Sequence, residues 1–255
     1  WMLQRTAEVM DDITEAFESF EFFRFFQLLQ NFCVTDLSNF YLDIAKDRLY
    51  VSAPADRRRR SCQTVMALII ERLAGLIAPV LCHMAEDIWQ NLPYSVAETS
   101  VFHRGWPEVP KEWRDLSVVE PVQQLRELRT AVNRVLEDCR SRQELGASLE
   151  AAVRIEARSA GLQSALSWLD EQGDALVDGL RDWLLVSQLQ LGGEPWAELL
   201  ASQDDPIALI EVSRARGTKC ERCWHYEGDV GQHPDHPHLC GRCVEVLGRR
   251  THQLA

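Results

Sequence analysis

Apolar residues recur at helical spacing along the first third of the chain, with acidic residues between them. The first run of apolar positions is Met10, Ile13, Phe17, Phe20 and Phe23. Steps of three or four residues place these side chains on one face of an α-helix. The pattern therefore predicts a long helix over residues 2–32 with one buried face, and its repetition predicts further helix over residues 32–42.

Two later stretches continue the helical pattern, and prolines interrupt them. Apolar residues at helical spacing over residues 59–76 predict a helix that ends near Pro79, because proline lacks the backbone N–H and clashes with the preceding turn. A short helix is expected over residues 80–92, before Pro93. Helices joined by connections this short are typical of a bundle. Residues 103–115 contain glycine, proline and tryptophan in a loop-like pattern, which indicates a domain boundary there.

Beyond residue 142 the hydrophobic period changes. Residues 118–142 still follow the helical pattern, but Val153, Ile155 and Ala157 alternate with charged residues, which is the period of a strand. Residues 183–191 and 207–213 are two more strand candidates, separated by glycines and an acidic loop. The chain is thus expected to be mainly α: a helical bundle over residues 1–115, a small α/β unit over 116–214 and a separate module over 215–255.

Four cysteines near the C-terminus form two CxxC pairs separated by sixteen residues: Cys220, Cys223, Cys240 and Cys243. Four thiolates at this spacing predict one tetrahedral zinc site, and a complete ligand set leaves no open position for catalysis. Arg222 and Arg242, one in each pair, are placed to moderate the negative charge of such a site. The alternatives are thiols without metal, or a histidine replacing one cysteine: His225, His233, His236 or His238.

Arg222 and Trp224 are the first candidates for nucleic-acid contact. A flat indole and a forked guanidinium on a rigid turn suit an unstacked base and its phosphate. The alternative is that Trp224 and Tyr226 form the small apolar core that such a short module needs.

Basic residues gather at a second place, around residues 46–60. Lys46 and Arg48 precede a run of four arginines at residues 57–60, and together they could form a phosphate-binding rim. The alternative is a solvated face, partly neutralised by neighbouring carboxylates. These carboxylates are Asp43, Asp47 and Asp56.

The overall charge of the chain limits how it could bind nucleic acid. The net charge of −12 argues against binding driven by total charge, but most of the acidic excess lies in residues 111–210. No apolar stretch reaches the length of a membrane span and the first residues carry no secretory signal, so a soluble protein is expected. The density of cysteines is low for a secreted disulfide scaffold and four of the eight stand alone in helix-like patterns, which indicates a reducing cytoplasm. No nucleophile–base motif and no phosphate-binding glycine loop occur, so this chain by itself is expected to be inactive. Its uncapped helical start suggests the downstream part of something longer.

Several stretches, in order along the whole chain, resemble the C-terminal part of bacterial isoleucyl-tRNA synthetases, which are class I aminoacyl-tRNA synthetases. The stretches are Tyr-Leu-Asp-Ile-Ala-Lys-Asp-Arg at residues 41–48, Ala-Pro to Glu-Asp-Ile-Trp at 78–89, Gly-Ala-Ser-Leu-Glu-Ala-Ala-Val at 146–153, and the cysteine pairs with their neighbours at 219–226 and 240–244. The family's His-Ile-Gly-His and Lys-Met-Ser-Lys-Ser signatures and its editing domain are absent.

The resemblance implies an anticodon-binding helical domain, an α/β junction domain and a Cys₄ zinc module. It implies the tRNA-binding region of a monomeric isoleucine–tRNA ligase that uses ATP in domains upstream, with one structural zinc and the anticodon arm of an isoleucine tRNA as partner. The implied tRNA contacts are Arg222, Trp224, Lys46, Arg48, Arg59 and Arg60. Two rivals are a free-standing zinc-finger RNA-binding module and the zinc-finger end of a DNA-repair glycosylase, which the helical first half disfavours.

Overall fold

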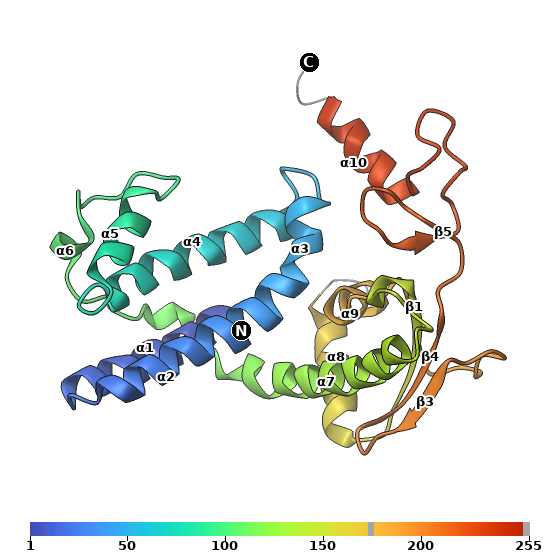
Figure 1. Ribbon diagram of the computed structural model, residues 1–255, viewed down its shortest axis with the longest axis horizontal. Helices are drawn as coiled ribbons and strands as arrows, with labels where there is room; N and C mark the ends of the chain where they lie inside the picture. Colours follow the sequence, from blue (N-terminus) through green and yellow to red (C-terminus); the bar gives the residue numbers. More distant parts are fainter. Residues whose placement is uncertain (173–175, 252–255) are drawn as a thin grey trace. The chain divides into compact units, whose positions relative to one another are not determined.

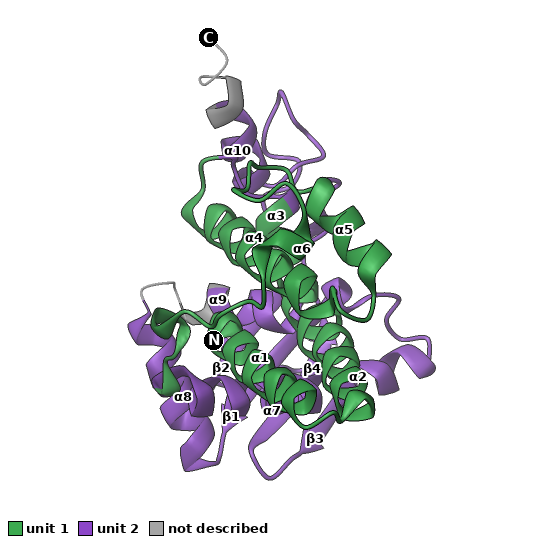
Figure 2. Cartoon of the chain, turned by 90° about the vertical axis from the view of Figure 1, so that its left-hand side faces the viewer, with its two compact units in different colours: residues 1–49, 55–116 green, residues 50–54, 117–255 purple. Residues whose placement is uncertain are grey.

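The computed structural model describes residues 1–172 and 176–251, and it forms two compact units. The first unit consists of Trp1–Leu49 and Ala55–Leu116, and the second consists of Tyr50–Pro54 and the residues from Ser117 onward (Figure 2). The short segment Tyr50–Pro54 thus packs with residues that lie far from it in the sequence. The division of the chain into three parts remains a prediction.

The first unit is a bundle of helices. Its elements are α1 (Met2–Glu18), α2 (Phe22–Asn31), a π-helix (Phe32–Leu42), α3 (Asp43–Tyr50), α4 (Arg57–Ile77), α5 (Cys82–Gln90), α6 (Val101–Arg104) and a 3-10 turn at Lys111–Trp113 (Figure 1). Helix α1 packs against α2 and α4, and α4 packs against α5. Met10, Ile13, Phe32 and Leu76 are fully buried between these helices, which confirms the predicted bundle and its buried helical faces.

The single helix expected over residues 2–32 is wrong, because the chain reverses after Glu18. Phe20 adopts a left-handed backbone with φ +58°, and the N–H of Glu21 donates to the carbonyl of Ala16 at 2.7 Å. Helix α2 then lies beside α1, and the Phe17 ring packs 4.8 Å from the ring of Phe25. The apolar period runs through this turn without a glycine or proline, so periodicity did not reveal it.

The second unit begins with a long helix and continues into a mixed sheet. A 3-10 turn (Leu116–Val118) leads into α7 (Val119–Ser141), and a second turn (Ser148–Glu150) precedes the sheet. The strands are β1 (Ala151–Ala157), β2 (Gln188–Leu191), β3 (Ala201–Asp204) and β4 (Ala208–Arg214), in the order β2-β1-β4-β3. Strands β1 and β2 are parallel and are joined through α8 (Ala160–Glu171) and α9 (Leu176–Leu184), whereas β4 is antiparallel to both neighbours.

The predicted α/β unit is confirmed, with two corrections to its strands. The alternation in β1 and the strand expected over residues 207–213 match the structure. The strand candidate at residues 183–191 is half wrong, since α9 extends to Leu184 and β2 begins only at Gln188. Part of the expected acidic loop is strand β3, which pairs with β4.

The two faces of strand β1 meet different environments, as the alternation of side chains requires. Val153 and Ile155 are buried with residues of α7 and α8 in the main core of this unit. Helices α7, α8 and α9 cover this face of the sheet (Figure 1). Arg154 points to the other side, where it is buried and donates to Glu211 at 2.8 Å.

The last part of the second unit is a small hairpin followed by a helix. Strands β5 (Thr218–Lys219) and β6 (Tyr226–Glu227) pair antiparallel, and α10 covers Gly241–Thr251. Gly217 enters the hairpin with φ +98°, and a Cβ there would collide with the carbonyl of Glu227. Only glycine fits such a position without strain. Within the described residues, no helix is both long enough and apolar enough to cross a bilayer.

Candidate metal centre and nucleic-acid interface

The four cysteines of the two CxxC pairs converge at the end of the second unit. Cys220 follows β5, Cys223 lies in the turn before β6, and Cys240 and Cys243 lie at the start of α10. Their Sγ atoms all lie within 4.8 Å of one another, and all four side chains are buried. The two pairs are tied together by the backbone, because the N–H of Cys240 donates to the Cys220 sulfur at 3.4 Å.

Four thiols this close cannot all ionise by themselves. Hydrogen bonds from Cys240 and Cys243 lower the pKa of the Cys223 thiol, because they stabilise its thiolate. The same contacts with Cys223 raise the pKa of Cys240, and they raise that of Cys243 to about 11. Zn²⁺ removes this conflict, since it deprotonates coordinating thiols and offsets their combined charge. The donor set therefore fits one structural zinc ion.

The alternative that a histidine replaces a cysteine finds no support among the described residues, where the cluster contains cysteines alone. Two of the four histidines lie near carboxylates. His233 approaches Asp229 at 3.7 Å, and His238 approaches Glu221 at 3.9 Å. Asp229 also accepts the N–H of Gly241 at 2.8 Å, and so ties the loop between the pairs to the start of α10.

The guanidinium of Arg222 is held by protein groups. Its Nη1 donates to the sulfur of Cys243 at 3.5 Å, and its Nη2 donates to the carbonyl of Val51 at 2.7 Å and to that of Tyr50 at 3.4 Å. Val51 is itself buried with the four cysteines in one apolar cluster. Sequence reasoning missed this contact, because nothing local links residues separated by about 170 positions. A direct contact of Arg222 with RNA stays a prediction.

Trp224 presents its ring to solvent. The side chain is 60% exposed and lies outside the apolar cluster around the cysteines, so the alternative that it forms the core of the module is wrong. The backbone is left-handed, with φ +67°, and its N–H donates to the carbonyl of Cys220 at 2.9 Å. The ammonium of Lys219 lies 5.7 Å from the centre of the indole, which places a cation beside an exposed aromatic face. Lys219 was not among the sequence candidates.

The other basic candidates lie in the first unit, on two helices. Lys46 and Arg48 belong to α3, and Lys46 forms an ion pair with Asp43 at 2.8 Å. Arg59 and Arg60 belong to the first turn of α4, where Arg59 is half-buried and Arg60 is exposed. The carboxylate of Asp56 caps this helix, accepting the backbone N–H groups of Arg58 and Arg59 at 2.8 and 3.2 Å.

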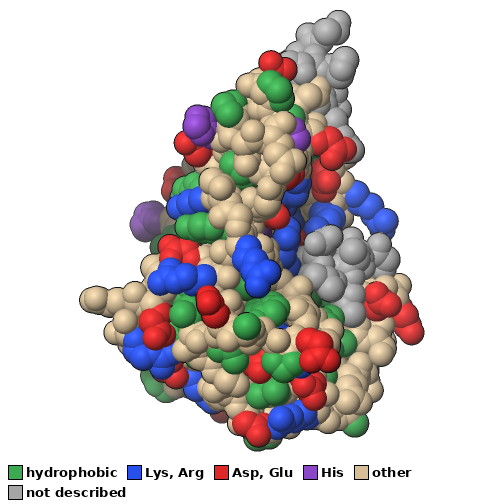
Figure 3. Space-filling model, turned by 90° about the vertical axis from the view of Figure 1, so that its right-hand side faces the viewer, with side chains coloured by type: hydrophobic (Ala, Val, Ile, Leu, Met, Phe, Trp, Pro, Cys, Tyr) green, Lys and Arg blue, Asp and Glu red, His purple; other side chains and the backbone are tan. Residues whose placement is uncertain are grey.

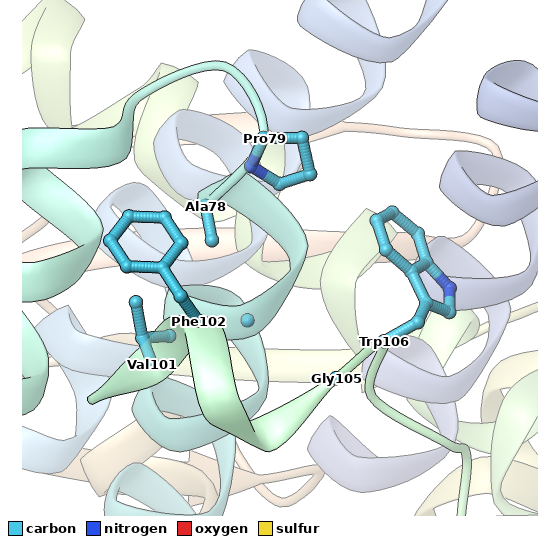
Figure 4. Close-up of a pocket in the computed structure, with 7 residues that line it drawn as sticks. Ala78, Pro79, Val101, Phe102, Gly105 and Trp106 are labelled. Carbon is cyan, nitrogen blue, oxygen red and sulfur yellow. The ribbon is translucent and has the colours of Figure 1, made fainter. Parts of the chain in front are cut away.

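Away from the cysteine cluster, the described residues form a surface of mixed charge (Figure 3) and an apolar cavity in the first unit. On the face drawn in Figure 3, Lys and Arg side chains are interspersed with Asp and Glu, without a large field of one sign. A cavity of about 200 Å³ in the first unit is lined by apolar or glycine residues only, and the close-up shows Pro79, Phe102 and Trp106 around it (Figure 4). Without a titratable group in its lining, this cavity is not a catalytic site.

Comparison with known protein families matches two separate stretches of the chain. Residues 1–155 match the family described as the anticodon-binding domain of tRNA ligase. Residues 217–246 match a zinc finger found in FPG and IleRS. The zinc-finger match alone names two classes of protein, so the match over the first 155 residues decides against the glycosylase rival.

Individual relatives extend this similarity over the whole chain. An isoleucine–tRNA ligase of Parasynechococcus marenigrum (strain WH8102) is 83% identical over 254 residues, covering 100% of this chain and 26% of the relative. Isoleucine–tRNA ligases of Prochlorococcus marinus are 78% identical (strain MIT 9313) and 49% identical (strain MIT 9515), each over 97% of this chain and 26% of the relative. The chain thus spans about a quarter of the length of the curated relatives it matches.

Proposed function

The chain belongs to the family of anticodon-binding domains of tRNA ligases, and we propose that it is the tRNA-binding C-terminal region of an isoleucine–tRNA ligase. In this proposal the full protein attaches isoleucine to its tRNA using ATP, in catalytic and editing domains that precede these residues. Residues 1–255 bind the tRNA in this proposal and take no part in the chemical step. We further propose that the full protein is a cytoplasmic monomer, and that the present chain contributes three parts to it: the bundle (1–115), the junction (116–214) and the zinc module (215–255).

The mechanism is positional. The helical unit binds the anticodon arm by its shape and by charge. The side chains that contact the tRNA phosphates in this proposal are Lys46, Arg48, Arg59 and Arg60. Phosphate contacts fix register, and contacts with unstacked bases provide the sequence information. Holding one end of the tRNA delivers its acceptor end to a distant reaction centre, and this lowers the entropic cost of the reaction there.

The zinc module presents the base-reading surface. Cys220, Cys223, Cys240 and Cys243 hold the zinc, which supplies rigidity and no chemical step. This rigidity fixes the turn that carries Trp224 and, two residues earlier, Arg222.

One observation carries the proposal most strongly: the exposed ring of Trp224 stands on a left-handed backbone. A bulky L-residue in that region costs roughly 1–2 kcal/mol. Because the residue is 60% exposed, its burial offsets only part of this cost. An aromatic side chain held in this way supports a binding role, and base stacking on such a ring is tolerant of sequence.

Binding to two tRNAs tests whether the anticodon is read. The zinc-loaded chain is titrated with an isoleucine tRNA and with the same tRNA carrying an exchanged anticodon, and the dissociation constants are compared. Weaker binding of the exchanged tRNA is expected, by about 1–3 kcal/mol for each exchanged base whose edge loses its hydrogen bonds to the protein. Equal affinities would reject anticodon reading and leave a general RNA-binding module.

The variant Trp224→Gly separates the ring from its backbone. Glycine adopts φ +67° without strain, so the zinc module should be at least as stable as in the parent chain. The affinity for tRNA should fall by about 1–3 kcal/mol, the value of one stacked base. Trp224→Ala is the matched control: it should lose the same affinity but retain the backbone strain. Unchanged affinity in both variants would remove Trp224 from the interface.

A further inference from the structure

We propose that Tyr50 is a second base-stacking residue of the RNA site, and that Arg222 positions it on the zinc module instead of contacting RNA itself. The inference rests on the proposed function, because it assigns the substrate as unstacked bases of a tRNA. It changes the role of Arg222 and adds a residue from α3 to a surface otherwise built from the C-terminal module.

Tyr50 combines an exposed ring with an anchored backbone. Its side chain is 78% exposed, although the next residue, Val51, is buried among the zinc-site cysteines. The segment Tyr50–Pro54 accordingly belongs to the same compact unit as the zinc module. A ring in solvent beside a buried anchor has no packing role in the described structure, so its phenol face is available to a planar ligand.

Arg222 is the group that holds this segment. One guanidinium nitrogen donates to the carbonyls of Val51 and Tyr50, and the other donates to the sulfur of Cys243. Its planar fork can bridge a thiolate and a carbonyl at the same time, which a lysine ammonium does less well. Three of the five guanidinium N–H groups donate to protein atoms in this way, so fewer remain for a phosphate. Arg222 therefore connects the metal site to the backbone that carries the Tyr50 ring.

The chemistry beside the exposed ring of Trp224 favours a single-stranded nucleic acid as the partner of this surface. Trp224 belongs to the same zinc turn as Arg222, and Lys219 lies 5.7 Å from its indole. Aromatic faces with a neighbouring cation are the combination that binds unstacked bases and their phosphates. A protein partner is the competing occupant, and the experiment below distinguishes it.

The first experiment measures binding of an isoleucine tRNA anticodon stem-loop, with a fluorescent adenine analogue in the loop, to the zinc-loaded 255-residue chain. Tyr50→Ala should weaken binding roughly 5- to 150-fold, which corresponds to the loss of one stacked base. It should also reduce the quenching of the adenine analogue that stacking on the ring causes. Tyr50→Phe keeps the ring and should bind within about twofold of the parent chain. Phe23→Ala is the matched control, because Phe23 is a similarly exposed ring (74%) in the first unit; its binding should be unchanged.

The outcomes separate the two proposals. If the parent chain fails to bind the stem-loop, the proposed function itself is rejected. If the parent chain binds and Tyr50→Ala binds equally well, the function stands and the role of Tyr50 is overturned. Equal losses for Tyr50→Ala and Phe23→Ala would also overturn it, since the effect would then be nonspecific.

The second experiment tests positioning by Arg222. Arg222→Lys keeps the charge but loses the fork, so amide exchange in residues 51–53 should accelerate while zinc stays at one ion per chain. Its effect on RNA affinity should disappear in the Tyr50→Ala background, because both changes remove the same stacked ring. Additive losses in the double variant, or unchanged exchange in residues 51–53, would overturn the positioning role. If zinc is lost, Arg222→Gln with restored metal content provides the comparison.

Discussion

At the scale of single residues, Arg154 and Glu211 form a buried ion pair in the second unit. The two side chains are 4% and 8% exposed, and their atoms lie 2.8 Å apart. Arg154 also donates to the carbonyl of Gly193 at 2.7 Å, so the buried guanidinium is satisfied on several sides. Buried charges are tolerated only with such complete partners.

The variant Glu211→Gln should lower the free energy of unfolding of the second unit by about 1–3 kcal/mol, because the buried guanidinium loses its buried carboxylate and keeps only the more exposed one of Glu156 at 3.2 Å. Urea titration followed by circular dichroism measures this change. Asp204→Asn is the control, because Asp204 pairs with Arg158 on the surface, where both side chains are well exposed. That change should cost less than about 1 kcal/mol. Equal costs for the two variants would contradict the assigned burial.

At the scale of elements, the N-terminus of helix α4 has an unfavourable charge distribution. Its first turn carries four arginines at the end where the helix dipole is positive, and cations there are unfavourable. The carboxylate of Asp56 compensates by accepting the N–H groups of Arg58 and Arg59. This arrangement stabilises a helix start that carries four cations.

The variant Asp56→Ala should destabilise the first unit by about 1–2 kcal/mol, since both the cap and the neutralising charge are lost. Asp56→Asn keeps the capping oxygen and should lose only the charge contribution, about 0.3–1 kcal/mol. Hydrogen exchange of the first-turn amides of α4 and urea unfolding measure the two effects. A loss for Asp56→Asn as large as that for Asp56→Ala would show that charge, not the cap, stabilises this end.

At the scale of the whole molecule, the metal and the helical bundle should respond separately. The cysteine cluster and the core of the first unit share no residue, and the two belong to different compact units. A strong chelator should therefore unfold the hairpin and α10, because binding energy of the metal is folding energy for a module this small. The far-UV helical signal should fall only slightly, while affinity for tRNA drops. Readding zinc should restore both signals; cooperative loss of all helicity would contradict this independence.

Much of the fold follows from local patterns. The helical period of the first third, the alternation of Val153 and Ile155, and the CxxC spacing each reflect contacts made within a few residues. The missed features depend on other interactions. The reversal at Phe20 occurs in a run of apolar residues with no turn-forming residue. Strand β3 is polar and half exposed, and it exists because β4 offers it hydrogen bonds.

The candidate site divides in the same way. The cysteines could be identified from spacing alone, because a tetrahedral metal requires two pairs of closely spaced thiolates. Trp224 was predicted to contact RNA because it follows the zinc-ligand candidate Cys223. Composition left a role in the core of the module equally open, and only the structure showed that the ring is exposed. Arg222 was expected to meet RNA, and the carbonyls that hold it were not predictable from its neighbours.

By itself the sequence determined the helical and strand periods, the zinc ligand set and the resemblance to a synthetase family, because these depend on spacing along one chain. Only the tertiary structure decided that Val51 packs against the zinc-site cysteines and that Arg222 links the two segments. The physical reason is that burial and hydrogen bonding act on residues close in space. Contacts separated by about 170 positions leave no periodic trace in the sequence.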